Sequence, residues 1–207
     1  MVVLAIRGFV ADASAIAGVD TRWLYLVQVV VPLAALLAWR ASYRELAVLP
    51  RRARPVFISI GAGIGVFLLW ITPVPGWMHL DASVASFVPV DAGGALRWDL
   101  IAARAFGAVL VVPLMEELFW RSFLMRWIEQ RDFLSLAPAS VSRFAVLASS
   151  LVFALAHELW LAGLVAGLVY AQLYRRLGNL WYAVLAHATT NLALGGWVVS
   201  QRAWPYW

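Results

Sequence analysis

Cysteine and lysine are both absent from this sequence, and charge of either sign is scarce. Of its 207 residues only 13% are charged, and all 16 basic residues are arginine. Without cysteine, the chain has no disulfide and no cysteine-ligated metal site. With so few charges, it lacks the polar surface that a soluble domain of this length needs. Its hydrophobic fraction of 64% and its mean hydropathy of +0.83 predict a polytopic membrane protein.

Internal repeats and low-complexity linkers are also missing, so we predict one integral membrane domain over residues 1–207. Residues 1–19 are apolar but are interrupted by Arg7, Asp12 and Gly18. They lack a continuous apolar core followed by a small-residue cleavage site, which is unlike a cleaved signal peptide. We expect an interfacial helix or a short additional span there.

Long apolar runs predict an all-α fold, a polytopic transmembrane helical bundle of about six to eight helices. Residues 1–98 are expected to hold the N-terminal spans and a long outer loop, and residues 99–199 the helical core that carries the chemistry. Gly61, Gly63 and Gly65 predict a smooth face for close helix packing. The expected spans are 23–39, 56–72, 99–120 with an extension to about 131, 144–160, 161–175 and 180–199.

Arginines gather in three segments between the spans, at 40–55, at 121–143 and at Arg175–Arg176. The positive-inside rule places all three in the cytoplasm and residues 73–98, whose charge balance is slightly acidic, outside. Many of the 12 tryptophans fall at segment ends, where their rings favour the membrane interface. Topology thus accounts for the net charge of +5, and no nucleic-acid partner is expected.

Glu116 and Glu117 stand side by side in an otherwise apolar stretch. An ionised acid near the centre of a membrane helix costs about 2.5–3.5 kcal/mol on insertion scales, so two adjacent acids indicate a function. Glu117 and Arg121 are four residues apart and share a helix face, which predicts an ion pair. Glu116 lies about 100° away around the helix and is left available for chemistry.

His157, His187 and Asn191 are further polar residues in apolar segments. His187 and Asn191 are four residues apart and project from one helix face. Each alone is more typical of a helix–helix hydrogen bond than of chemistry. Together with the two acids, on three spans of one small bundle, they predict a functional site. Buried Glu and His residues also suit a proton-coupled carrier, although a carrier is expected to show internal repeats.

Three motifs occur in order: Glu116-Glu117-x-x-x-Arg121, Phe153-x-x-x-His157 and His187-x-x-x-Asn191. They resemble the motifs of the CPBP intramembrane proteases, a family that includes the eukaryotic Ras-converting CAAX endopeptidase and bacterial Abi-type proteins. The small size and the many tryptophans also resemble CAAX-protease-related proteins found beside bacterial exosortase systems. The resemblance implies an intramembrane endopeptidase of a bacterial inner (cytoplasmic) membrane.

The resemblance also implies a role for each motif residue. Glu116 with His157 would activate a water molecule that attacks a peptide carbonyl, and His187 with Asn191 would donate hydrogen bonds to the oxyanion. No cofactor is expected. Zinc held by Glu116, His157 and His187 is the alternative, disfavoured because Asn191 is a poor zinc ligand and no HExxH helix is present. The resemblance implies a structural role for three further residues, which would orient the catalytic side chains: Glu117, Arg121 and Phe153.

The expected partners are the lipid bilayer and a substrate, either a membrane-anchored protein or a lipidated peptide. A prenylated CAAX substrate requires a host with protein prenylation, for which the sequence offers no indication. A non-catalytic membrane module of the immunity or scaffold type is the other alternative to an enzyme. The intact motifs favour catalysis.

Overall fold

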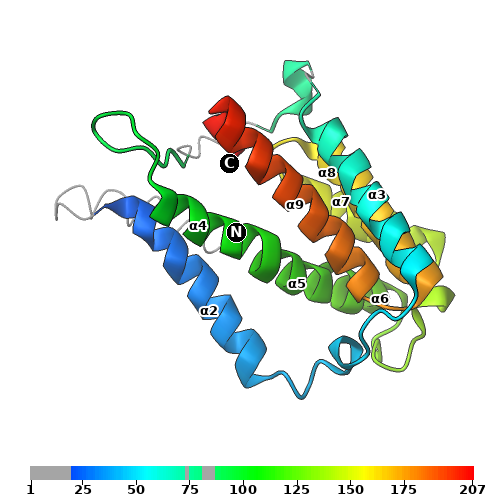
Figure 1. Ribbon diagram of the computed structural model, residues 1–207. Helices are drawn as coiled ribbons and strands as arrows, with labels where there is room; N and C mark the ends of the chain where they lie inside the picture. The colour runs from blue at the N-terminus through cyan, green and yellow to red at the C-terminus, as the bar shows by residue number, and fades with distance from the viewer. Residues whose placement is uncertain (1–19, 73–74, 81–86) are drawn as a thin grey trace.

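The computed structural model describes residues 20–72, 75–80 and 87–207 (Figure 1). Residues 1–19, where an interfacial helix or an extra span is expected, lie outside the described part, as do residues 73–74 and 81–86 of the predicted outer loop. Besides short 3₁₀ turns, the described ranges form six helices and no β-strand, so the all-α prediction is confirmed. The helices are α2 (Leu24–Ala38), α3 (Ala53–Trp70), a long helix (Trp98–Glu129), α7 (Arg143–Leu155), α8 (Trp160–Leu177) and α9 (Trp181–Gln201).

The long helix is not a uniform α-helix. Its α-helical parts are α4 (Trp98–Phe106), α5 (Val112–Glu117) and α6 (Met125–Glu129), and two π-helical segments, η4 (Gly107–Val111) and η5 (Leu118–Leu124), lie between them. In a π-helix each N–H bonds to the carbonyl five residues earlier. Such segments are rare in proteins, and those that occur often lie at functional sites. The two adjacent acids therefore lie at the end of a short α-helical piece between two π segments.

α2 packs along the long helix, as Figure 1 shows. Val29 and Leu36 of α2 are buried in a small cluster with Val111. Gly107 permits this close approach, because a Cβ atom there would lie 2.3 Å from Cγ2 of Val29 and 2.5 Å from the hydroxyl oxygen of Tyr25. α2 thus supports the first π segment from the side.

α3 packs closely against α9, and one glycine marks the contact. A Cβ atom at Gly63 would lie 2.3 Å from the carbonyl oxygen of Ala186 and 2.8 Å from Cβ of Thr189. The sequence predicts that Gly61 and Gly65 share this packing face, but nothing lies within 4 Å of their Cβ positions. The prediction is wrong for these two residues because side chains two positions apart point to nearly opposite sides of an α-helix.

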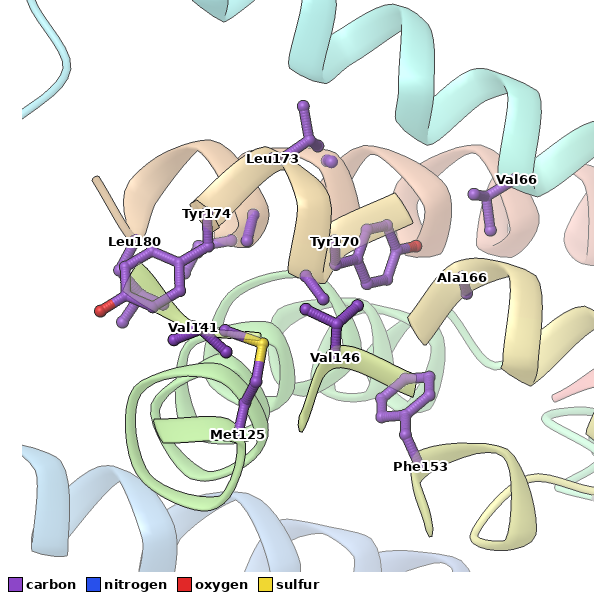
Figure 2. Packing of buried hydrophobic residues seen from close by; sticks show 14 of the residues in the cluster. Val66, Met125, Val141, Val146, Phe153, Ala166, Tyr170, Leu173, Tyr174 and Leu180 are labelled. Atoms are coloured by element: carbon purple, nitrogen blue, oxygen red, sulfur yellow. The ribbon is translucent and has the colours of Figure 1, made fainter. Parts of the chain in front are cut away.

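The main core lies where α6, α7, α8 and α9 meet. Tyr170 and Tyr174 project from α8 into it, and each is 1% exposed. Aromatic side chains of this size bury a large apolar area and dominate the packing energy of a small bundle. Figure 2 shows the two tyrosines among core side chains that include Met125, Val141, Val146, Phe153 and Leu180.

Polar contacts fasten the segment between α2 and α3 to one end of the bundle. Glu45 forms an ion pair with Arg126 of α6 and also accepts a hydrogen bond from the hydroxyl of Tyr174. The three Arg-rich segments predicted to be cytoplasmic therefore meet at one end, although their side of the membrane stays a prediction. Further hydrogen bonds at this end run from Trp181 Nε1 to Leu46 O, from Asn179 Nδ2 to Val48 O and from Arg175 Nε to Val141 O.

Two of the described helices, Ala53–Trp70 and Trp98–Glu129, are long and apolar enough to cross a membrane. α2 and α7 are also apolar but are shorter. A membrane-crossing role for the remaining helices stays a prediction of the sequence.

Candidate active site

A cavity of about 200 Å³ opens between α3, the long helix, α8, α9 and the turn that follows α7. Glu116, His157, His187 and Asn191, which the sequence singles out for chemistry, all line this cavity. The structure thus brings together residues that are spread over 76 positions of the chain, from 116 to 191. The other lining residues are mainly apolar or aromatic: Trp70, Ala108, Val112, Phe153, Ala166, Tyr170, Thr190, Leu194 and Trp207.

The two adjacent acids have different surroundings. Glu117 is fully buried, with Oε1 2.8 Å from Nδ1 of His187 and Oε2 3.1 Å from Nε of Arg121. Glu116 lines the cavity, and its Oε2 is buried without a hydrogen-bond partner in the described part of the chain. The predicted pairing of Glu117 with Arg121 is confirmed, and Glu116 is the acid whose Oε2 has neither a hydrogen bond nor an ion pair among the described residues.

Arg121 is held in place by three neighbours besides Glu117. Its Nη2 donates a 3.3 Å hydrogen bond to the carbonyl of Gly167 on α8. The guanidinium carbon lies 4.3 Å from the ring centre of Phe153 and 5.4 Å from that of Tyr170. A buried ion pair is stable only when such contacts replace water. Arg121 therefore gives Glu117 a counter-charge inside an apolar core and holds its carboxylate in place.

His157 lies in the turn after α7, not inside the helix. The sequence predicts a span to residue 160, but α7 ends at Leu155. Nδ1 of His157 lies 2.7 Å from the carbonyl oxygen of Phe153. Because a carbonyl only accepts, Nδ1 carries the hydrogen, and Nε2 of the neutral ring remains as an acceptor. The ring also packs against the rings of Phe153, at 4.3 Å between centres, and Trp70, at 5.7 Å.

His187 is fixed by stacking as well as by Glu117. Its ring lies parallel to that of Tyr170, with 5.0 Å between centres and 17° between planes. The Tyr170 hydroxyl donates to Thr190 Oγ1 at 2.7 Å, and Thr190 in turn donates to the carbonyl of Gly63 at 2.9 Å. Sequence reasoning did not find Tyr170 or Thr190. Thr190 follows His187 by three positions, a spacing that could have revealed it; nothing in the sequence marks Tyr170.

Asn191 connects the cavity to the first π segment. Its Nδ2 donates a 2.7 Å hydrogen bond to the carbonyl oxygen of Ala108, inside η4. A π segment interrupts the regular series of α-helical hydrogen bonds, so a side chain can donate a hydrogen bond to a backbone carbonyl there. The amide group carries two hydrogens, and the second remains for a ligand in the cavity.

The donor groups of the site bear on whether a metal ion is held there. Over residues 20–72, 75–80 and 87–207, no group of three His, Asp or Glu side chains is placed to hold a metal ion. Nδ1 of His157 and Nδ1 of His187 are both engaged, by Phe153 and Glu117. The Nε2 atoms of both rings are left open, as they are in histidines that bind zinc, so the expectation that no cofactor is needed stays a prediction.

A scan of known families agrees with the three motifs. Residues 98–193 match the family described as Type II CAAX prenyl endopeptidase Rce1-like. The matched region contains both acids, both histidines and Asn191, so the resemblance to CAAX-type CPBP proteases is confirmed over this part of the chain. The match supports a peptidase function. No curated protein and no solved structure matches the chain.

Proposed function

We propose that this protein is an intramembrane endopeptidase that hydrolyses a peptide bond of a membrane-associated protein. The observation that carries the proposal is the buried, unpartnered Oε2 of Glu116 in one cavity with His157, His187 and Asn191. An unsatisfied buried oxygen lowers stability and needs an explanation, of which a catalytic role is one. The match to a family of endopeptidases supports the same reaction.

In the first step Glu116 acts as the general base. A water molecule in the cavity donates one hydrogen bond to Glu116 and the other to Nε2 of His157, the acceptor that its bond to Phe153 leaves open. The water oxygen attacks the carbonyl carbon of the peptide bond while its proton passes to Glu116. General-base catalysis of this kind is typically worth about 10²–10⁴-fold in rate.

Asn191 and His187 stabilise the negative charge that forms on the carbonyl oxygen. Asn191 donates its second amide hydrogen. His187 bonds through Nδ1 to the Glu117 carboxylate, so it donates from Nε2 only when the ring carries a second proton. When the C–N bond breaks, the leaving amine takes the proton from Glu116, and the products are a carboxylic acid terminus and a free amine.

A second groove provides a route for an apolar substrate. It has a volume of about 540 Å³, lies between α4, η4 and α9, and shares Ala108, Asn191 and Trp207 with the cavity. Nearly all of its lining is apolar. A membrane-anchored protein or a lipidated peptide can therefore reach Glu116 without leaving an apolar environment. We place the protein in a bacterial inner membrane, as the family resemblance implies, with Ala53–Trp70 and Trp98–Glu129, which are long and apolar enough to cross it, as spans.

The experiment that tests the proposal compares the termini of membrane proteins in host cells producing the wild type or Glu116→Ala. New amino and carboxyl termini should appear in pairs with the wild type and be missing with the variant. Identical termini in the two strains, with equal amounts of both proteins in the membrane, would contradict the proposal and favour a non-catalytic module.

A further inference from the structure

A third groove lies between α3 and α8 and takes no part in the chemistry proposed above. Its volume is about 450 Å³, and its walls are apolar side chains such as Ile58, Val169 and Leu173. Two polar residues of α8, Gln172 and Arg176, also line it. None of these residues lines the cavity that contains Glu116.

Positive charge gathers at one end of this groove. Ile58, near the start of α3, and Arg176, near the end of α8, line the same groove, so the two helices run in opposite directions beside it. Arg54 lies one helical turn before Ile58 on the same face of α3. Arg54 and Arg176 are both exposed. Two arginines from different helices therefore flank the end of an apolar groove.

These arginines are not neutralised by the acids that the structure describes. No ion pair joins Arg54 or Arg176 to a carboxylate within the described ranges. Glu45, the acid of the preceding segment, is already paired with Arg126. The charge at the end of the groove is therefore available for an external anion.

Gln172 adds a polar group with an unused acceptor. Its Oε1 is buried and has no hydrogen-bond partner in the part of the chain that the structure describes. A group that carries a hydroxyl and lies in this groove can satisfy that oxygen. The groove thus offers apolar walls, a hydrogen-bond acceptor and two free positive charges in one place.

We infer that this groove binds an anionic phospholipid, with an acyl chain along α3 and α8 and the phosphate beside Arg54 and Arg176. A free inorganic anion would leave the apolar walls unused, and an apolar helix would leave both arginines unpaired. Basic pockets between membrane helices on the cytoplasmic side are typical headgroup sites, and this end of the bundle carries the segments predicted to be cytoplasmic. The inference requires a membrane location but not the peptidase reaction.

Native mass spectrometry of the full chain in detergent, with added phosphatidylglycerol or phosphatidylcholine of identical acyl chains, tests the inference. Phosphatidylglycerol should bind more tightly. An arginine beside an anionic lipid raises the affinity about fivefold. Arg54→Gln and Arg176→Gln should therefore each weaken the binding of phosphatidylglycerol by about that factor and leave the binding of phosphatidylcholine unchanged. Arg143→Gln is the matched control, because Arg143 is exposed at the same end but belongs to α7, which is not one of the two helices that form the groove.

Three results would overturn the inference. Equal affinity for the two lipids would show that the arginines do not recognise the headgroup. Equal weakening by Arg143→Gln and Arg176→Gln would show diffuse attraction to surface charge instead of a site. Displacement of the bound lipid by inorganic phosphate alone would show an anion site in which the apolar groove has no part. All three variants change exposed residues, so their folding is expected to be intact.

Discussion

Oε1 of Glu117 and Nδ1 of His187 lie 2.8 Å apart, although the two residues are separated by 70 positions in the chain. This hydrogen bond joins the long helix to α9 and fixes the imidazole ring that also stacks on Tyr170. Glu117 does not itself line the cavity, and its other oxygen is engaged by Arg121, so it reaches the cavity only through His187. We therefore interpret Glu117 as a positioning residue.

Glu117→Gln should lower both stability and activity. The substitution leaves the buried Arg121 without its counter-charge, which costs about 3–5 kcal/mol for a fully buried pair. It also removes the carboxylate that orients the His187 ring. Thermal unfolding in detergent should show a lower Tm, and cleavage per folded molecule should fall as well.

The double variant Glu117→Gln with Arg121→Met separates these two effects. Removing both charges together should recover part of the lost Tm, because no unpaired ion remains in the core. It should not recover cleavage, because His187 still lacks its carboxylate partner. Wild-type cleavage by the double variant would show that the contact with His187 has no part in the reaction.

Asn191→Ala should reduce turnover and weaken the fold to a smaller extent. Loss of one oxyanion donor typically reduces kcat by about 10²–10³-fold. The carbonyl of Ala108 would also lose its hydrogen-bond donor, which should lower the free energy of unfolding by about 1–3 kcal/mol. Kinetics with a cleaved substrate, beside thermal unfolding, measure the two effects separately. An unchanged kcat with a lowered Tm would restrict Asn191 to supporting the π segment.

The sequence predicts part of this site because helical spacing is local. It predicts the pair Glu117–Arg121 and the shared face of His187 and Asn191, since both depend only on residues four positions apart. The hydrogen bond from Glu117 to His187 and the bond from Asn191 to Ala108 depend on how distant helices pack. The π segments of the long helix cannot be predicted from apolar periodicity. Nor can the end of α7 at Leu155, since the apolar run continues to residue 160.

The glycines of α3 offer a test of the packing between α3 and α9. Gly63→Ala should destabilise the protein by about 1–3 kcal/mol, because its Cβ would lie 2.3 Å from a backbone oxygen of α9 that has little room to move. Gly65→Ala is the matched control, since nothing lies within 4 Å of that position. Replacing an open helical glycine by alanine stabilises by about 0.5–1 kcal/mol. Equal Tm values for the two variants would contradict the packing described.

Removal of metal ions should leave cleavage unchanged. Over the described ranges no three His, Asp or Glu side chains are placed to hold a metal ion, and the proposed reaction uses only side chains and water. The measurement is the rate of substrate cleavage before and after incubation with a zinc chelator such as 1,10-phenanthroline. A loss of activity that added zinc restores would contradict the proposed mechanism.

The most direct test of the account is the cleavage rate of purified Glu116→Gln, measured beside its thermal unfolding on a substrate identified from the changed termini. Glutamine keeps the size of the side chain but cannot take the proton of the attacking water. The account predicts a loss of at least about 10²-fold in cleavage with a Tm close to that of the wild type. Cleavage by Glu116→Gln at the wild-type rate would contradict the assignment of Glu116 as the general base.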